Sequence, residues 1–335
     1  MQETTKLLQS YLHGKRLSNA IGSYLDYYQS LSCKKAIVRH LPPALMIEPT
    51  NICNLKCPLC PSGNGTLKRS RGMMSFSVFK NIVDQIANQI GMLILWNQGE
   101  PYLNPEFNRM VRYAADKMLY TMTSTNASLS MDHEKIVKSG LDKIIISMDG
   151  ISEETYNNYR INGNYSLVLK NMERLVATRE RLRSKTPYIV WQFIIMRHNE
   201  SEITQVKQMA RDIGVDKLDF KTVQIYRPED IKFLPTDHKL SRYSFSENNF
   251  ELRTRLLNRC RRIWTQPVIN WDGEFSICCY DKDVSFKIGN INDESMDQLW
   301  HSHKLMKIRN TILKERASIE ICRNCGEGIV QKIKV

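Results

Sequence analysis

The sequence predicts an α/β protein in which a parallel sheet is covered by helices. Between residues 44 and 225, short apolar runs alternate with stretches of helical length and helical periodicity. Runs that are apolar throughout are typical of strands buried on both faces, as in parallel sheets. The repeated order of strand, helix and strand predicts right-handed crossovers, which curl the sheet. A chain of 335 residues allows about two domains, so a smaller α+β region is expected beside the sheet.

The elements of the sheet region follow from these patterns in order. The expected strands cover residues 44–47, 92–96, 119–123, 143–147, 188–196 and 217–223. The expected helices cover residues 75–90, 104–117, 132–139, 153–160, 165–184 and 201–213. Ser75 or Ser77 is the expected N-cap of the first of these helices, and Asn104 that of the second. Six strands with their helices fall short of the eight units of a closed barrel.

The first 43 residues predict a polar helical arm. Apolar residues recur at helical spacing in residues 7–12 and again in residues 17–28, and Pro42 and Pro43 end the segment. We expect this arm to pack on the body of the protein. The alternative is a basic amphipathic helix on an anionic membrane surface, which would give residues 1–40 a peripheral membrane contact.

The chain after the sheet region divides into two parts. Residues 226–259 are polar and predict an irregular linker that crosses the mouth of the curled sheet. From Cys260 the composition changes, and Asp272-Gly273 between two short strand-like runs predicts a β-hairpin. A helix is expected over residues 295–314. The predicted parts are therefore the arm 1–43, the sheet region 44–225, the linker 226–259 and a small α+β domain 260–335.

Composition restricts the environment and the partners. No apolar run reaches the ~18 residues of a membrane span, and no signal peptide follows Met1. Nine cysteines without an export signal favour a cytoplasmic location and metal ligation over disulfides. The formal net charge of +13 fits either a solvated basic surface or an anionic partner, such as a phosphorylated substrate or lipid headgroups. Nucleic acid is not expected, because no basic run is interleaved with aromatic residues.

Three cysteines follow the first expected strand with the spacing Cys-x3-Cys-x2-Cys. They are Cys53, Cys57 and Cys60, on the loop that begins at Glu48. Three thiolates this close on one loop are able to hold three corners of a cubane iron–sulfur cluster, which leaves the fourth iron without a protein ligand. An open metal position is where a substrate or cofactor binds. The alternative is a structural zinc knuckle whose fourth ligand lies elsewhere.

At these residues the chain resembles the radical S-adenosylmethionine (SAM) superfamily. The resemblance implies a [4Fe-4S] cluster on the three cysteines, with the amino and carboxylate groups of SAM on the open iron. It further implies a partial (β/α)6 barrel and an external electron donor such as flavodoxin or ferredoxin. A 5′-deoxyadenosyl radical made from SAM would abstract hydrogen from a substrate.

The same resemblance assigns SAM contacts to residues near the ends of the expected strands. Gly99, Glu100 and Pro101 occupy the place of the family's Gly-Gly-Glu-Pro-like motif, which binds the SAM amino group, and Gln98 replaces the first glycine. Thr125 and Asn126 follow the third strand and suit the ribose hydroxyls. The remaining SAM positions are Ser147, Asp149, Arg160, Gln192 and Lys221.

Four later cysteines resemble the SPASM/twitch domain that follows many radical SAM barrels. Cys260, Cys278, Cys322 and Cys325 provide ligands for one auxiliary [4Fe-4S] cluster, in a spacing similar to the short form found in aminocyclitol dehydrogenases. The pattern of a glycine followed after four residues by a cysteine favours Cys278 over Cys279. A zinc ribbon is the alternative.

The resemblance implies a radical SAM oxidoreductase. A fully ligated auxiliary cluster would accept an electron, which favours net two-electron oxidation of a small polar, sugar-like or aminocyclitol-like molecule. A peptide-modifying maturase and an epimerase, with Cys279 as the hydrogen donor, are the alternatives. The substrate would be a small polar molecule, a peptide or a lipid-linked compound. The alternative from another class is a non-enzymatic iron–sulfur or zinc-binding adaptor.

Overall fold

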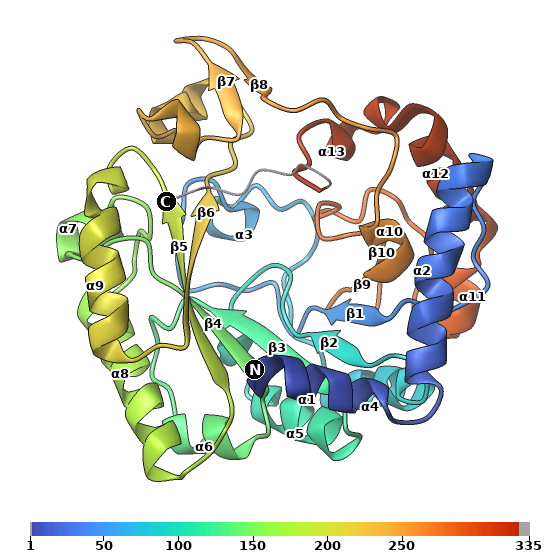
Figure 1. Cartoon of the computed structure of the whole chain (residues 1–335), viewed down its shortest axis with the longest axis horizontal. Coiled ribbons are helices and arrows are strands. Elements are labelled where there is room, and N and C mark those ends of the chain that lie inside the picture. Colours follow the sequence, from blue (N-terminus) through green and yellow to red (C-terminus); the bar gives the residue numbers. More distant parts are fainter. Residues whose placement is uncertain (1, 328–335) are drawn as a thin grey trace.

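The computed structural model describes residues 2–327 and contains an open, curved sheet with helices along its outer side (Figure 1). Eight strands form this sheet in the order β10-β9-β1-β2-β3-β4-β5-β6. The parallel strands of the barrel are β1 (Ala44–Ile47), β2 (Met92–Ile94), β3 (Tyr120–Thr125), β4 (Lys143–Ser147), β5 (Tyr188–Ile195) and β6 (Lys217–Thr222). Each overlaps its predicted range, so the α/β fold class is confirmed.

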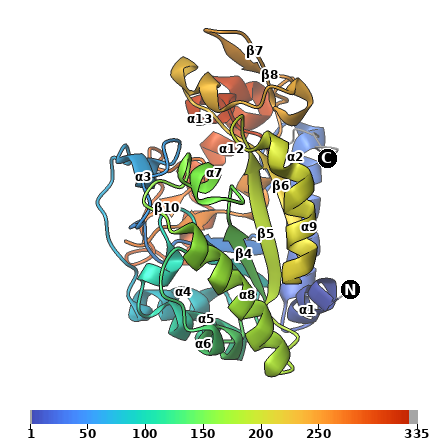
Figure 2. The same cartoon turned by 90° about the vertical axis from the view of Figure 1, so that its left-hand side faces the viewer.

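Helices return the chain along the outside of the sheet (Figure 2). The longer ones are α4 (Phe76–Ile86), α5 (Phe107–Asp116), α6 (His133–Lys138), α8 (Tyr165–Arg181) and α9 (Ile203–Ile213). Shorter helices within the connections are α3 (Pro61–Asn64), η1 (Pro101–Leu103), α7 (Glu153–Asn157) and η2 (Glu200–Glu202). The apolar side of α4 shows why they pack here, since its Phe79, Ile82 and Ile86 are fully buried in the core.

One of the two predicted helix caps is correct. The Ser75 hydroxyl accepts the Val78 N–H at 3.3 Å and caps α4. The predicted cap at Asn104 is wrong, because α5 begins at Phe107. The Asn104 side-chain amide instead donates to the carbonyls of Pro49 and Met74, both at 2.9 Å, and so ties two neighbouring loops together.

The N-terminal arm packs on the body as predicted, through α1 (Gln2–Tyr11) and α2 (Arg16–Cys33). Arg16 is buried at the start of α2. Its guanidinium donates to the carbonyls of Ala87 at 2.7 Å and Lys117 at 2.6 Å. These residues are the C-caps of α4 and α5. A single cation therefore stabilises the carbonyl ends of two helices.

The C-terminal hairpin joins the barrel sheet, which the sequence did not predict. Strands β9 (Val268–Ile269) and β10 (Phe275–Ser276) flank the expected turn, where Gly273 has a φ of +88°. Strand β9 pairs in parallel with β1, with Met46 opposite Val268. The hairpin thus covers an edge of β1 that would otherwise expose unpaired backbone groups.

The rest of the C-terminal half corrects two expectations. Residues 226–259 are not wholly irregular, because they contain η3 (Pro228–Phe233), η4 (His238–Leu240) and the hairpin of β7 (Tyr243–Phe245) and β8 (Phe250–Leu252). The helix expected over residues 295–314 is two helices, α11 (Met296–Trp300) and α12 (His303–Glu315). They are separate because the Ser302 hydroxyl caps a new helix at the Leu305 N–H. The remaining short helices are α10 (Arg262–Thr265), η5 (Arg316–Ser318) and α13 (Glu320–Arg323).

None of the helices within residues 2–327 is both long enough and apolar enough to cross a bilayer.

The position of Arg16 generates a stability prediction. Arg16→Met leaves the C-terminal carbonyls of α4 and α5 without their buried donor, so we expect the free energy of unfolding to fall by about 2–4 kcal/mol. Urea denaturation of the full chain measures the change. Lys15→Met removes the neighbouring exposed cation and serves as the matched control, with an expected change within about 0.5 kcal/mol. Equal effects of the two substitutions would contradict the capping role.

Candidate active site

The loop after β1 carries the three cysteines of the motif at the carboxyl end of the barrel sheet. All three are free thiols; Cys57 is buried, and Cys53 and Cys60 are partly exposed. The Cys60 N–H donates to the Cys57 carbonyl at 3.1 Å, which closes a turn between the last two thiols. A Cβ atom on Gly63 would lie 2.7 Å from the Cys57 nitrogen. A glycine is therefore required where α3 returns against this thiol loop.

The surroundings of the thiols suit a metal cluster. The Leu55 N–H donates to the Cys53 sulfur at 3.4 Å, and the Asn126 amide approaches the same sulfur at 3.8 Å. Burial raises the pKa of Cys53 to about 11 and that of Cys57 to about 12. Thiols of this kind become thiolates when a metal displaces the proton. Three free thiols on one loop, with N–H donors on one of the sulfurs, fit an iron–sulfur cluster with an open iron.

A buried ion pair fixes the base of the thiol loop. The Arg69 guanidinium donates to the Glu48 carboxylate at 2.7 Å, and the Gln98 N–H donates to the other oxygen of this carboxylate at 3.1 Å. Arg69 also donates to the Lys282 carbonyl at 2.7 Å. Burial raises the pKa of Glu48, and Arg69 opposes this shift. The pair connects the ends of β1 and β2 with the C-terminal region.

Glu100 connects the ends of β2 and β3. Its carboxylate accepts the Asn126 N–H at 2.7 Å, the Thr125 hydroxyl at 2.8 Å and the Tyr102 N–H at 3.2 Å. Two of these bonds reach Oε1 and one reaches Oε2. Burial raises the pKa of Glu100 to about 7, although these bonds favour the ionised form. The contact of Glu100 with the SAM amino group stays a prediction.

Gly99 is the position of the motif where glycine is required. Its φ is +75°, and a Cβ there would lie 2.5 Å from the Thr50 carbonyl oxygen. The preceding Gln98 departs from the family pattern, and its side-chain oxygen lies 3.3 Å from the Ser62 hydroxyl. The chain thus keeps the glycine that closely approaches the thiol loop, and Pro101 begins η1 directly after Glu100.

Arg160 and Asp149 form a second buried ion pair. The Arg160 Nε donates to Asp149 at 2.6 Å, and the other Asp149 oxygen accepts the Ile194 N–H at 2.7 Å. Burial lowers the pKa of Arg160, but Asp149 and then the Cys57 thiol outweigh this effect and raise it. The structure therefore brings Arg160 beside the thiol loop. Ser147 is the last residue of β4, and its hydroxyl lies 3.5 Å from that of Ser124 on the neighbouring strand β3.

A cavity of about 690 Å³ lies inside the curved sheet. Its apolar wall comes from the first three strands and the segment after β2, through Met46, Met92, Ile94, Trp96 and Met122. The last three strands form a mostly polar wall through Lys143, Gln192, Asp219 and Lys221, with Ile145 beside Lys143 on β4. The C-terminal region contributes Arg262, Gln266, Cys279, Tyr280 and Lys282. The predicted positions Gln192 and Lys221 therefore line this cavity, and Lys221 pairs with Asp219 at 2.8 Å.

Lys143 and Asp219 are lining residues that the sequence analysis missed. For Asp219 the available signal was the charged residue at every second position of β6, because alternate side chains share one face of a sheet. For Lys143 the signal was weaker, a single charged residue at the start of an apolar strand. At one end of the cavity Lys143 pairs with Glu3 of α1 at 2.6 Å.

The four later thiols gather beside the sheet. Cys260, Cys322 and Cys325 are buried and free, and Cys278 is partly exposed. Burial raises the pKa of Cys278, and the nearby thiols of Cys279, Cys260 and Cys325 raise it further. Free thiols that approach one another in this way fit the ligand set of a cluster.

Arg316 is a buried cation facing these thiols, and the sequence analysis missed it. It is 1% exposed, and its Nη1 donates to the carbonyls of Arg259 at 2.7 Å and Glu327 at 3.2 Å. Within residues 2–327, its Nε and Nη2 have no oxygen or nitrogen acceptor, and the guanidinium interacts with the Cys322 thiol. Burial lowers the pKa of Arg316, but the thiols of Cys260, Cys325 and Cys322 outweigh it and raise that pKa. Two donors without such an acceptor, facing thiols, are what an anionic cluster would satisfy.

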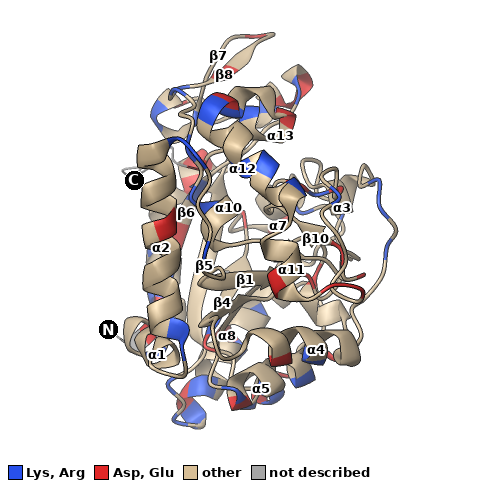
Figure 3. Ribbon diagram, turned by 90° about the vertical axis from the view of Figure 1, so that its right-hand side faces the viewer, with Lys and Arg blue, Asp and Glu red and all other residues tan. Residues whose placement is uncertain are grey.

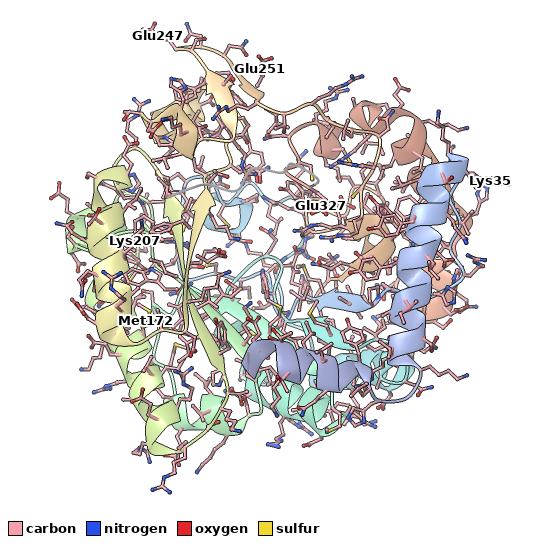
Figure 4. The ribbon with its side chains drawn as sticks, in the orientation of Figure 1. Lys35, Met172, Lys207, Glu247, Glu251 and Glu327 are labelled. Atoms are coloured by element: carbon pink, nitrogen blue, oxygen red, sulfur yellow. The ribbon has the colours of Figure 1, made fainter. Side chains whose placement is uncertain are left out.

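Cys279 faces a different side from Cys278. Its sulfur accepts a hydrogen bond from the Arg262 Nη1 at 3.1 Å, and Arg262 pairs at 2.7 Å with Glu327. Glu327 is labelled in Figure 4. Cys279 packs against the apolar group that contains Met46. Cys278 packs against the main core instead. The geometry thus supports Cys278 as the cluster ligand and directs Cys279 to the cavity.

The environment of Arg316 generates a redox prediction. Removing a buried positive charge disfavours the more negative, reduced cluster, so Arg316→Gln should lower its midpoint potential by on the order of 50–100 mV. EPR-monitored redox titration measures this shift, and iron content verifies loading. Arg323→Gln removes an exposed cation from the same region and is the control. An unchanged potential in a loaded Arg316→Gln enzyme would contradict the electrostatic role.

Comparison with known proteins agrees with this geometry. The radical SAM superfamily model matches residues 47–213, and the model of the SPASM iron–sulfur cluster-binding domain matches residues 260–326. These matches decide against the zinc and adaptor alternatives.

Similar chains extend the comparison. The tungsten-containing aldehyde ferredoxin oxidoreductase cofactor-modifying protein of Pyrococcus furiosus is 23% identical over 299 residues, covering 78% of this chain and 81% of that protein. The chain spans about half the length of several other curated relatives.

Solved structures show the same fold. Streptococcus suis SuiB bound to precursor peptide SuiA has a TM-score of 0.61 at 15% identity, covering 84% of this chain and 70% of SuiB. BtrN in complex with AdoMet and 2-DOIA has a TM-score of 0.56 at 14% identity, covering 89% of this chain and 98% of BtrN. The cofactors of this chain are SAM, the [4Fe-4S] cluster of the radical site and auxiliary iron–sulfur binding in the SPASM domain. The chain belongs to the radical SAM superfamily and is a radical SAM enzyme with a C-terminal SPASM iron–sulfur domain.

Proposed function

We propose that this enzyme abstracts hydrogen from a small polar substrate and completes a net two-electron oxidation. The observation that carries the proposal is the cavity, which has polar side chains on one wall and an apolar wall opposite. Its volume of about 690 Å³ is in the range of small-molecule sites. The proposed substrate is sugar-like or aminocyclitol-like, because the polar wall offers many hydrogen-bonding groups and few apolar ones.

The polar wall of the cavity contains a carboxylate and an ammonium group that pair with each other. The Asp219 carboxylate pairs with Lys221, and Gln192 of β5 lies opposite Asp219 in the register of the sheet. Burial raises the pKa of Asp219, but Lys221 outweighs this effect, and the pKa lies below its ordinary value. An ionised carboxylate accepts hydrogen bonds from substrate hydroxyls or amines and is available to take up a proton. The methionine-rich wall adapts to the apolar face of a ring.

The chain's own residues divide the work of binding. Cys53, Cys57 and Cys60 would hold the radical cluster, and Cys260, Cys278, Cys322 and Cys325 an auxiliary cluster. When bound, these groups together with SAM supply a 5′-deoxyadenosyl radical and an electron acceptor. Glu100 and Arg160 would orient the amino and carboxylate ends of SAM. Once hydrogen has been abstracted from the substrate carbon, Asp219 would take the proton that the attached hydroxyl or amine group releases as the auxiliary cluster accepts the electron.

A contact between two segments lies where the cavity adjoins a second groove. The Lys282 ammonium donates to the Tyr226 hydroxyl at 2.6 Å, joining the C-terminal region to the chain after β6. A groove of about 690 Å³ lies beside it, and Gln224, Tyr280 and Lys282 line both spaces. We infer that the substrate enters from this groove, where the contact limits access of water.

The second candidate reaction is epimerisation of a small molecule or peptide. Cys279 supports it, because this thiol lines the cavity and is oriented by Arg262. The open groove beside the cavity would accommodate a peptide. An electron donor such as flavodoxin or ferredoxin is a further proposal, and the net charge of +13 suits an acidic partner. The cytoplasmic location stays a prediction.

Two cysteine substitutions separate oxidation from epimerisation. If the reaction is an oxidation, Cys322→Ala should still form 5′-deoxyadenosine but lose most product, whereas Cys279→Ala should retain product. 5′-Deoxyadenosine and the oxidised substrate are both measured with a panel of sugars and aminocyclitols, and iron content is measured for each variant. Cys33→Ala changes an exposed thiol on α2 and is the control. Full product formation by a Cys322→Ala enzyme that lacks the auxiliary cluster would exclude the electron-acceptor role.

A further inference from the structure

Helix α2 buries its polar side and exposes its apolar side. Surface helices of soluble proteins have the opposite arrangement. The buried polar residues are Arg16, Asn19, Ser23, Asp26 and Ser30. The large apolar residues on the exposed side are Leu17, Ile21, Tyr24, Leu25 and Tyr28. The apolar repeat seen in the sequence is therefore not what packs this arm on the body.

Specific hydrogen bonds hold the polar side in place. The Asn19 amide donates to the Leu41 carbonyl, and the Ser23 hydroxyl donates to the Trp264 carbonyl, both at 3.0 Å. The Asp26 carboxylate accepts the Arg39 N–H at 2.7 Å. These bonds fix the rotation of the helix about its axis, because buried polar groups without partners are costly. The outward direction of the apolar side is thus set by the body of the protein.

The exposed apolar residues continue onto α1. Leu8 of α1 and Leu12 directly after it are 60% and 72% exposed, and Ile21 and Tyr28 of α2 are 55% and 61% exposed. Figure 2 and Figure 3 show both helices along the same edge of the molecule. We call this surface the arm stripe, which consists of Leu8, Leu12, Leu17, Ile21, Tyr24, Leu25 and Tyr28. These are seven of the molecule's twelve large exposed hydrophobic residues within 2–327, so the exposure is concentrated here rather than scattered.

The charge around the arm stripe is positive. Asp26 is the only acidic residue between positions 4 and 47; it is 1% exposed and pairs with Arg39. The exposed basic residues on or next to the two helices are Lys6, His13, Lys15, Lys34 and Lys35. Glu3 of α1 is partly exposed and pairs with Lys143. Lys35 lies at the end of α2 (Figure 4). A hollow of about 620 Å³ beside it is lined by Lys34, Lys35, His303, Met306, Lys307, Asn310 and Lys314, without a carboxylate.

These features point to an anionic lipid surface as the partner. Apolar side chains flanked by lysines and accompanied by tyrosines are typical of helices that lie in the headgroup region of a bilayer. A second copy of the chain is a poorer partner, because it would bring two sets of exposed lysines together. We propose that α1 and α2 dock the enzyme on an anionic membrane, with the arm stripe at the boundary between headgroups and acyl chains.

Vesicle flotation of the full chain tests this proposal. Wild-type protein should float with vesicles of phosphatidylcholine and phosphatidylglycerol, and at least about tenfold less with phosphatidylcholine alone. Combining Leu17→Ser, Ile21→Ser and Leu25→Ser should weaken binding to the anionic vesicles by at least about tenfold. Combining Lys34→Glu and Lys35→Glu should weaken it by a similar factor, as should high salt.

The controls keep folding and self-association apart from membrane binding. Met73→Ser with Ile161→Ser removes exposed apolar side chains beside the thiol loop, away from the arm, and should leave binding unchanged. Thermal unfolding verifies that the stripe variant is folded. Wild-type protein that fails to bind anionic vesicles, or a folded stripe variant that binds them equally well, overturns the proposal. Equal binding to both vesicle types overturns the anionic preference. A wild-type dimer that the stripe variant loses, without vesicle binding, would assign the surface to a second copy.

Discussion

The parallel pairing of β9 with the edge of β1 determines where the chemistry of this enzyme takes place. Strand β1 leads directly into the thiol loop, and β9 is the first strand of the hairpin that connects the auxiliary thiols Cys260 and Cys278. The pairing therefore brings both cysteine groups to the same sheet. The Arg69 guanidinium, which bonds Glu48 and the Lys282 carbonyl, adds a polar connection between the same two regions. The walls of the cavity likewise come from both the barrel strands and the C-terminal region, so its shape depends on the whole chain rather than on the barrel alone.

Buried cations recur wherever this structure gathers thiols. Arg160 lies beside the radical-site loop and is neutralised by Asp149, whereas Arg316 faces the auxiliary thiols with two donors that have no oxygen or nitrogen acceptor among residues 2–327. This difference has a physical consequence, because an unpaired cation acts on a nearby cluster more strongly than one already held by a carboxylate. The two sites are therefore electrostatically distinct, as expected for sites with different redox roles. A third cation, Arg262, pairs with Glu327 and donates to the sulfur of Cys279, which belongs to neither group of cluster cysteines and faces the cavity.

Much of this arrangement follows from local sequence, and the parts that do not have identifiable reasons. The barrel strands were predictable because runs such as Ala44–Ile47 are apolar throughout. Gly99 was predictable because it stands in the Gly-Glu-Pro motif, and the structure shows that its neighbours leave no room for a side chain there. The pairing of β9 with β1 was not, since a strand of two residues has no detectable periodicity. Arg316 was missed because arginine is normally exposed and nothing local marks its burial. In α2 the helical spacing was recognised, but the outward direction of its apolar side depends on hydrogen bonds made by residues distant in sequence, such as Trp264.

The most direct test of this account is reductive SAM cleavage without added substrate. After anaerobic reconstitution, the wild-type chain should contain about two [4Fe-4S] clusters and form 5′-deoxyadenosine from SAM with a chemical reductant. An enzyme combining Cys53→Ala, Cys57→Ala and Cys60→Ala should retain the auxiliary cluster, because its four thiols lie on other segments, and should form no 5′-deoxyadenosine. The single Cys33→Ala enzyme should behave as wild type. Continued formation of 5′-deoxyadenosine by the triple variant would contradict the assignment of these three thiols to the radical cluster.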